Sequence, residues 1–521
     1  MNAKRWIWSG VTLAVLGCAG SALAAPFTCP KKGGDLVFGG EAKVNSLDQY
    51  GSQTISTRNV VSNVFEPLMT RDETNAPILD LAESMTESPD RLTYTFKIRQ
   101  GIKFHNGKDM TSADVVASFD RYSKVGIERG FLINVAGWEA PDKYTFVIKM
   151  KKAQPTFIED LSSFSQPVVI IPAEQKDKPA LQLEPIGTGP FQVAEYVADS
   201  HVKLKRYEGY KPNTKFEQRT GFGGYKVACV DTVTYRIVTE SGARVAGLQT
   251  GELMAVEDVP TKAQADLKKN PKIALLPLEN WWVHIMLPNT YKGPTSNLAF
   301  RKAVQAALDM DEIMDASTDG AYKLNIGFQY PGRATYTDAG KETYNLKNKD
   351  LAKKYLKEAN YKNEPLVLLT NKDYTSMYNA ALVVAEQLKG VGINAKVDVV
   401  DWPTSVNRMI KEKEQNTWHF FYTGYGTQPA LGPLATMKFF VHGGNATPVP
   451  ADAELNAAYD DMINKPDPKE RQAAFARMQK RILEQVYAVP FGSLTKVQAV
   501  RSNVKGFKPF RIPRFSNVWI E

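Results

Sequence analysis

The sequence has few of the residues and motifs that mark metalloproteins, disulfide scaffolds and common enzyme classes. Three cysteines and five histidines occur in 521 residues, too few cysteines for a disulfide-rich scaffold. The histidines do not stand at metal-ligand spacing, and no His-Glu-x-x-His, Gly-x-Ser-x-Gly or Walker sequence is present. We therefore expect that the protein has neither a metal site nor a cofactor and is not an enzyme, although the residues of a catalytic triad can lie far apart in a sequence.

An excess of charge of one sign is also missing. The 65 basic and 56 acidic residues give a net charge of +9, and lysines alternate with acids, as in residues 347–358. This pattern is typical of solvated helix faces, so we expect no nucleic-acid partner. The length indicates two or three domains. Because no low-complexity linker separates them, we expect lobes in contact rather than domains in series.

The sequence has one long apolar stretch, at its N-terminus. Lys4-Arg5 precedes a charge-free segment, and Ala-Leu-Ala at 22–24 is a small-residue cleavage pattern. We expect residues 1–24 to be an export signal cleaved near Ala24. Removing 24 of the 521 residues leaves 497, and losing two basic residues lowers the net charge from +9 to +7. A lipoprotein anchored at Cys18 is the alternative, because Val-Leu-Gly-Cys at 15–18 resembles a lipidation site.

Two cysteines remain once the signal is removed. An oxidising compartment would allow Cys29 and Cys229 to form a disulfide, which we expect. The alternative is a pair of free thiols.

Hydrophobic periodicity predicts a mixed α/β chain. An apolar strand at 365–370, a helix at 376–389 and an alternating strand at 393–399 indicate a βαβ unit with parallel strands. A half-buried strand is predicted at 93–99. Thr111 and Asp114 form a predicted capping box before a helix. One helix is predicted over 297–314.

Residues 99–119, Arg-Gln-Gly-Ile-Lys-Phe-His-Asn-Gly-Lys-Asp-Met-Thr-Ser-Ala-Asp-Val-Val-Ala-Ser-Phe, resemble the family 5 extracellular solute-binding proteins of ABC importers. Segments 77–84, 187–191, 300–309 and 504–507 resemble the same family in the same order. The resemblance implies an α/β, two-lobed periplasmic binding protein fold of type II, in the large cluster with an extra subdomain in lobe one.

The resemblance also implies boundaries and a function. Lobe one would combine 33–66, 185–284 and 490–521, with the extra subdomain at 67–184 and lobe two at 285–489. The protein would be a monomeric periplasmic receptor that binds a peptide-like or other small organic solute and delivers it to a membrane permease. A secreted enzyme and a periplasmic chaperone or sensor with this fold remain alternatives. No histidine pair supports nickel or haem transport.

By the same resemblance, several segments would line the ligand cleft. The candidate ligand-binding residues are Trp282, Trp402, Gly424, Tyr425, Thr427, Gln428, Asp48, Asp401 and Arg408. Flat aromatic rings suit a tolerant wall, with core packing as their alternative. Neighbouring residues on a strand face opposite ways, so we expect either Trp281 or Trp282 to belong to the core.

One departure from the family concerns charge. Relatives that bind peptides usually have an acidic residue just after a Gly-aromatic pair, whereas residues 424–440 contain no Asp or Glu. A desolvated ammonium without a carboxylate partner costs several kcal/mol. We therefore expect a ligand without a free α-amino group there, such as a blocked peptide, an opine-like conjugate or a sugar, unless Asp48 or Asp401 supplies the charge. Arg408 could bind a ligand carboxylate or be a surface helix residue.

Overall fold

The computed structural model describes residues 25–521 except 53, 166, 334, 427–435 and 442–447. Within these ranges eleven strands form one sheet that extends through both halves of the molecule. In order of pairing they are β17 (Ala395–Val400), β16 (Leu366–Asn371), β18 (Phe420–Tyr425), β14 (Ile273–Pro288), β19 (Val489–Arg501), β13 (Ala255–Val256), β1 (Asp35–Gly40), β12 (Thr232–Ile237), β9 (His201–Arg206) and β8 (Phe191–Val197), with β15 (Tyr322–Lys323) beside β19.

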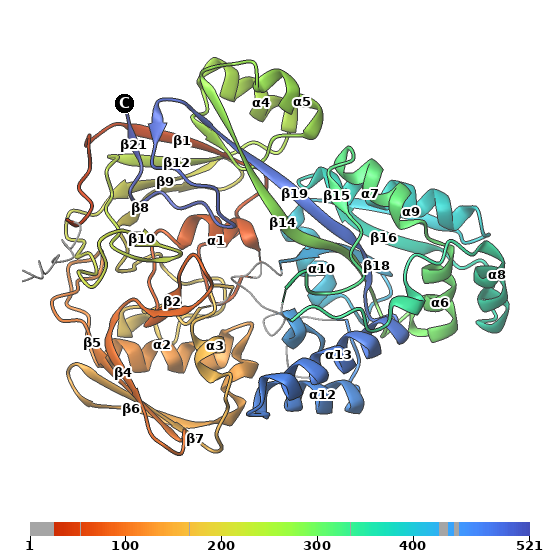
Figure 1. Ribbon diagram of the computed structural model, residues 1–521, viewed down its shortest axis with the longest axis horizontal. Helices are drawn as coiled ribbons and strands as arrows, with labels where there is room; N and C mark the ends of the chain where they lie inside the picture. Colours follow the sequence, from red (N-terminus) through yellow and green to blue (C-terminus); the bar gives the residue numbers. More distant parts are fainter. Residues whose placement is uncertain (1–24, 53, 166, 334, 427–435, 442–447) are drawn as a thin grey trace, which may run out of the picture.

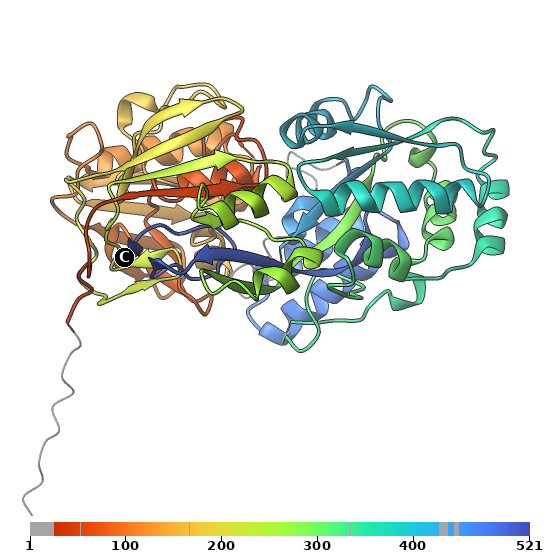
Figure 2. The same ribbon diagram turned by 90° about the horizontal axis from the view of Figure 1, so that it is seen from above.

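Two bodies lie side by side in Figure 2, and the long antiparallel strands β14 and β19 run between them (Figure 1). We call the body around β1, β12, β9 and β8 lobe one, and the body around β16, β17 and β18 lobe two. Each has its own apolar core. Strand β19 contributes Val500 to the core of lobe one and Phe491 to the core of lobe two, so the connection is itself packed.

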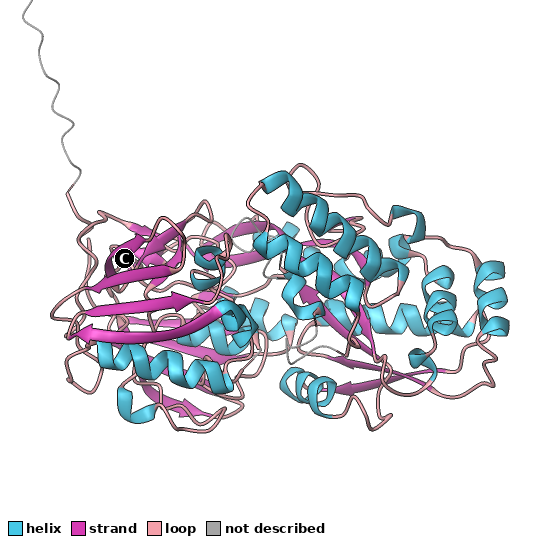
Figure 3. Ribbon diagram, turned by 90° about the horizontal axis from the view of Figure 1, so that it is seen from below, coloured by secondary structure: helices cyan, strands magenta, loops and turns pink. Residues whose placement is uncertain are grey.

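Helices surround lobe two, whereas strands dominate lobe one (Figure 3). The helices of lobe two are α6 (Leu298–Ala307), α7 (Met310–Thr318), α8 (Lys349–Glu358), α9 (Thr375–Lys389), α10 (Trp402–Lys411), α12 (Ala453–Asn464) and α13 (Pro468–Glu484). Those on the side of lobe one are α1 (Ile55–Val61), α2 (Ser112–Val125), α3 (Phe157–Leu161), α4 (Ser241–Thr250) and α5 (Thr261–Leu267). Within the described ranges, every helix falls short of the length and apolar character that a bilayer span requires.

Four antiparallel strands form a separate sheet beside lobe one. They are β4 (Ala82–Glu87), β5 (Thr93–Ile98), β7 (Thr145–Met150) and β6 (Val135–Asp142). Tyr94, Phe96 and Ile98 point to the buried face of β5, as their alternation predicted, and they join the same core as β1. Three two-stranded ribbons complete the strands: β2 (Met69–Arg71) with β3 (Pro77–Leu79), β10 (Arg219–Thr220) with β11 (Gly223–Gly224), and β20 (Val504–Lys505) with β21 (Trp519–Ile520).

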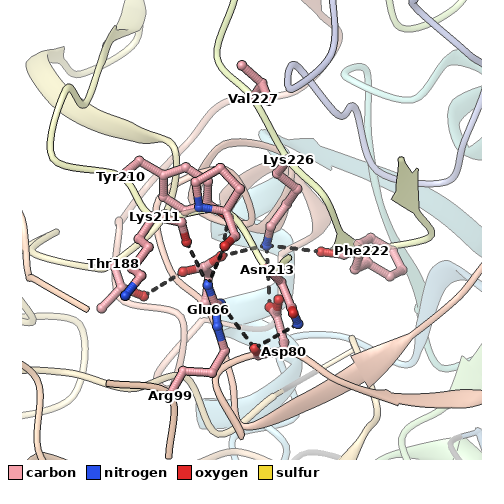
Figure 4. A network of polar contacts seen from close by, with 12 residues as sticks. Glu66, Asp80, Arg99, Thr188, Tyr210, Lys211, Asn213, Phe222, Lys226 and Val227 are labelled. Carbon is pink, nitrogen blue, oxygen red and sulfur yellow. Dashed lines mark hydrogen bonds and ion pairs between the residues drawn. The ribbon is translucent and has the colours of Figure 1, made fainter. Parts of the chain in front are cut away.

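A buried polar network ties this subdomain to lobe one (Figure 4). The ammonium of Lys226 lies 2.7 Å from a Glu66 carboxylate oxygen and 3.3 Å from an Asp80 oxygen. Arg99 donates to the carbonyls of Asp80 and Pro212. Burial raises the pKa of Asp80 to about 6, with the neighbouring charge of Glu66 acting in the same direction. Because the charged groups of this network have partners within the protein, we assign the network to structure.

The βαβ prediction is confirmed. Strands β16 and β17 pair in parallel, in register from Leu366 with Ala395 to Asn371 with Val400, and α9 connects them. The capping box of α2 is also present: the backbone N–H of Thr111 donates to Asp114 Oδ2 at 2.8 Å.

The single helix predicted over 297–314 is wrong, because the chain forms α6 and α7 with a break between them. Asp309 adopts an extended backbone and its carboxylate accepts hydrogen bonds from the N–H groups of Asp311 and Glu312, which starts α7. A capping aspartate within an otherwise continuous apolar stripe was the available signal. The disulfide between Cys29 and Cys229 is present, with Cα atoms 5.5 Å apart, and joins the N-terminal segment to the loop before β12.

Candidate ligand site between the lobes

A pocket of about 100 Å³ lies between the two lobes, and we call it the inner pocket. Lobe one contributes Ile55 and Arg58 from α1, together with Arg511 from the C-terminal segment. Lobe two contributes its aromatic wall, chiefly Trp402 and Tyr425. Residues far apart in the chain thus meet at the place where the two bodies face one another.

Trp402 begins α10 directly after strand β17. Pro403 occupies the first turn and the Asp401 carboxylate accepts from the N–H of Thr404 at 2.9 Å, so the helix starts at a capped end. The indole is 7% exposed and stacks on Phe421, with ring centroids 5.8 Å apart and planes at 22°. Its position outside the carboxyl end of a parallel strand is where open α/β sheets bind ligands.

The tryptophan pair follows an irregularity in β14. The pairing register with β19 shifts between Leu278 and Trp282, and Asn280 has a positive φ of 52°. Both indoles are buried, with ring centroids 6.0 Å apart. Trp282 lines the inner pocket, whereas Trp281 packs beneath the guanidinium of Arg511, 5.0 Å from its ring centroid.

Strand β18 brings Gly424 and Tyr425 to the same pocket. Gly424 is packed under an indole: a Cβ there would lie 2.4 Å from a ring atom of Trp282. Tyr425 stacks on Phe439 with centroids 5.2 Å apart, and burial raises the pKa of its hydroxyl. The absence of a side chain at position 424 therefore lets the indole of Trp282 pack directly against the backbone of β18.

Arg511 reaches the pocket across the backbone of Gly426. A Cβ at position 426 would lie 1.8 to 2.4 Å from the guanidinium atoms, so the arginine needs glycine there. Its Nη1 donates to the carbonyl of Trp281 at 2.7 Å. Burial lowers the pKa of Arg511 to about 10, and the charge of Arg58 acts in the same direction. Burial likewise lowers the pKa of Arg58 to about 10, opposed by the charge of Glu128. Both side chains remain cations near neutral pH.

A second chamber is lined by Trp282 and by residues of β19, one of the two strands that connect the lobes, and we call it the hinge pocket. It measures about 140 Å³ and is lined by Glu41, Trp281 and Lys496 among others. The buried lysine of this pocket has acidic partners: Lys496 contacts Glu41 and lies 3.4 Å from Glu257. Burial raises the pKa of Glu41 to about 8, opposed by the charge of Lys496. Lys496 therefore has acidic partners within the protein.

A third, larger chamber lies between the four-stranded subdomain and lobe two. Its volume is about 780 Å³, and its described lining includes Phe131 and Trp138 on one side and Phe439 and Tyr459 on the other. We call it the outer pocket. Phe439 lines both this chamber and the inner pocket. Across the same gap, Lys438 Nζ lies 2.5 Å from Glu128 Oε2, an ion pair between the lobes.

The structure does not bring Asp48 to the cleft. Both carboxylate oxygens contact the guanidinium of Arg121, at 2.6 and 3.2 Å, and neither side chain is exposed. The N–H groups of Tyr50 and Gly51 also donate to this carboxylate. We therefore correct its assignment as a ligand anchor: Asp48 balances a buried internal charge.

Arg408 also lies away from the described pocket lining. Its guanidinium pairs with Asp398 at 2.7 Å and with Glu412 at 3.2 Å, so the alternative of a surface helix residue describes it better than a ligand contact. Asp401 acts as the cap of α10 and is not among the lining residues. Thr427 and Gln428 lie outside the described residues.

Sequence reasoning missed Arg58 and Arg511. Arg58 lies on the short helix α1, and Arg511 lies ten residues from the C-terminus in a segment without regular structure. Neither has a local sequence signal, because only the folded lobes bring them together. No group of three or more His, Cys, Asp or Glu side chains able to hold a metal ion occurs in the described part of the chain.

Comparison with known proteins gives three results. Residues 76–448 match the family model of bacterial extracellular solute-binding proteins, family 5 (middle part). The glutathione-binding protein GsiB of Salmonella paratyphi A is 26% identical over 505 residues, covering 95% of each chain.

Solved structures are similar over nearly the whole chain. AgaA of A. tumefaciens R10, in complex with agropinic acid, has a TM-score of 0.81 and 26% identity, covering 94% of this chain and 99% of its own. DppA of Helicobacter pylori, in complex with the peptide STSA, has a TM-score of 0.82 at 23% identity, with coverage of 94% and 99%. At 23% identity, the similarity to DppA shows a shared fold alone.

Proposed function

The chain belongs to the bacterial extracellular solute-binding proteins of family 5, and from this premise we propose that it is the exported receptor of an ABC importer. It binds a peptide-like or other small organic solute between its lobes and passes it to permease subunits in the inner membrane. The relatives named above, which bind glutathione, agropinic acid and a peptide, support this solute class.

One observation carries the proposal: the inner pocket is built from both lobes. Arg58 and Arg511 belong to one body, and Trp402 and Tyr425 belong to the other. A solute in contact with both lobes binds the closed arrangement better than the open one and shifts the population toward it. Closure also excludes water, which strengthens each polar contact. This differential affinity is what a transport receptor needs to signal that it is loaded.

The proposal includes release into the periplasm after cleavage near Ala24, and action as a monomer without a catalytic step. A disulfide between Cys29 and Cys229 fits an oxidising compartment. The absence of acids from 424–440 fits a solute without a free α-ammonium group in the inner pocket.

Binding and turnover can be separated by one experiment. The exported chain is incubated with a library of peptides, blocked peptides and sugar or amino acid conjugates. Bound solutes are counted by native mass spectrometry and then released and identified. We expect one solute per chain, recovered unchanged, and loss of binding in Trp402→Ala. A chemically altered solute would indicate an enzyme, and binding unaffected by Trp402→Ala would place the site elsewhere.

A further inference from the structure

The charged side chains of the inner pocket all have one sign. Among its described lining residues, Arg58 and Arg511 are the charged ones, and no aspartate or glutamate accompanies them. Two stretches of the chain outside the described residues, 427–435 and 442–447, contain no Asp or Glu in their sequence. The pocket thus concentrates positive charge between the lobes.

Arg511 is the better defined of the two cations. Arg511 is 6% exposed, and its guanidinium forms no salt bridge with a carboxylate of the described residues. The guanidinium donates to the backbone carbonyl of Trp281 and lies over the indole ring of the same residue. A buried charge without a counter-ion is costly in a low-dielectric interior. An anion supplied from outside would remove that cost.

Two neutral hydrogen-bond donors of the pocket also lack an acceptor in the described part of the chain. Trp282 Nε1 and Trp402 Nε1 are buried and have no hydrogen-bond partner among the described residues. Their side chains are 5% and 7% exposed, and both line the inner pocket with the two arginines. An indole N–H can only donate. A ligand with several oxygen acceptors could accept hydrogen bonds from both N–H groups, whereas an ammonium, which only donates, could not.

The backbone is also shaped around the cation. Gly426 leaves space for the guanidinium of Arg511 where any other side chain would collide with it. The hinge pocket forms a contrast, because there Lys496 has Glu41 and Glu257 as partners. The protein therefore supplies acidic partners to the buried Lys496, whereas no salt bridge within the described residues involves Arg511.

We propose that the solute of the inner pocket is an organic acid whose carboxylate binds Arg511 and Arg58 between the lobes. The inference rests on the proposed receptor function and specifies its ligand class. A planar guanidinium can hold both oxygens of a carboxylate, and the flanking indole N–H groups of Trp282 and Trp402 offer further donors. Such a solute also favours closure, because its carboxylate would contact the two arginines of lobe one while the rest of the molecule contacts the aromatic residues of lobe two.

Matched pairs of acids and amides test this inference. The probes are succinate with succinamide, N-acetylglycylglycine with its amide, and glutathione with its dimethyl ester, at constant ionic strength. Phenyl phosphate is added as a second kind of anion. Thermal unfolding and calorimetry measure binding to the unaltered chain, to Arg511→Gln and to Arg511→Lys. Arg236→Gln is the matched control, because Arg236 is exposed on β12 and pairs with Glu252.

We expect at least one acid to bind and its neutral partner to bind far more weakly. Loss of a hydrogen-bonded charge contact weakens affinity roughly ten- to hundredfold, so Arg511→Gln should show this loss and Arg511→Lys a smaller one. Arg236→Gln should leave the affinity unchanged. Equal binding of an acid and its amide, preference for phenyl phosphate, no binding of any acid, or unchanged affinity in Arg511→Gln would each overturn the inference.

Failure of this inference can be told apart from failure of the receptor function. If a neutral or cationic solute binds and Trp402→Ala abolishes its binding, the receptor function stands and the organic-acid inference falls. If a solute binds but its binding does not depend on Trp402, the site lies elsewhere and the organic-acid inference falls. If no solute binds at all, both fall. The folded state of each variant is checked by circular dichroism before binding is measured.

Discussion

Asp48→Ala should destabilise lobe one without acting on the ligand site directly. The Asp48 carboxylate and the Arg121 guanidinium are both fully buried and form two contacts, at 2.6 and 3.2 Å. The carboxylate also accepts from the backbone N–H groups of Tyr50, Gly51 and Leu183. Its removal leaves these donors and one buried cation without their acceptor.

The magnitude follows from the cation that is left behind. Arg121 would keep the carbonyls of Lys178 and Pro179 and the face of Tyr50, but no anion. Removing one partner of a buried pair typically costs about 3–5 kcal/mol. Replacing both partners by apolar residues is often nearly neutral, so the pair Asp48→Leu with Arg121→Met should recover much of the loss.

Urea unfolding followed by circular dichroism measures the free energies. Asp401→Ala is the matched control, since Asp401 caps α10 at the surface and its loss should cost about 1 kcal/mol. A cost for Asp48→Ala no greater than that of Asp401→Ala would refute the reasoning. Loss of solute binding at unchanged stability would refute it too, because Asp48 would then be a ligand residue after all.

Three further predictions concern the cleft, the hinge pocket and the disulfide. Gly426→Ala should displace the guanidinium of Arg511 and lower the affinity for a carboxylate solute about tenfold, measured by calorimetry, whereas Gly242→Ala, which has open space, should not. For Glu41, burial raises the pKa from 4.5 to about 8, so the folded state holds a proton that the unfolded state has released. The free energy of unfolding should therefore fall as pH rises between these values, by at most ~1.4 kcal/mol per pH unit, and Glu41→Gln should lack that decline. Cys29→Ser should lower the free energy of unfolding in urea by about 2–4 kcal/mol, because it removes a cross-link between residues 200 positions apart. An unchanged midpoint of unfolding would contradict this.

Local patterns in the sequence predicted much of the fold. The unit of β16, α9 and β17 followed from apolar runs of the right length and period, and the cap of α2 from Thr111 and Asp114. The break at Asp309 was missed because the apolar stripe continues through it, and the capping aspartate within that stripe was not used as a signal. Strand β19 gives no alternating signal in the sequence, because its 13 residues are mostly buried on both faces.

The candidate site was predictable only in part. Trp282, Trp402, Gly424 and Tyr425 were placed by resemblance, and the structure gathers them in the inner pocket. Charged residues were harder to place. An aspartate in a loop, such as Asp48, can face a cleft or a buried arginine 73 positions away, and nothing in its neighbours distinguishes the two. Arg511 lies on lobe one and reaches its pocket only through the contact between lobes, which is a property of the tertiary fold.

Hydrogen–deuterium exchange, with and without a bound solute, tests the central claim most directly. If the solute is held between two lobes, backbone amides of α1 in lobe one and of α10 and β18 in lobe two should all exchange more slowly when it is bound. The same solute should give no such protection in Trp402→Ala. Protection confined to one lobe, or protection that survives the loss of Trp402, would contradict the claim that this protein binds its solute by closing two lobes around it.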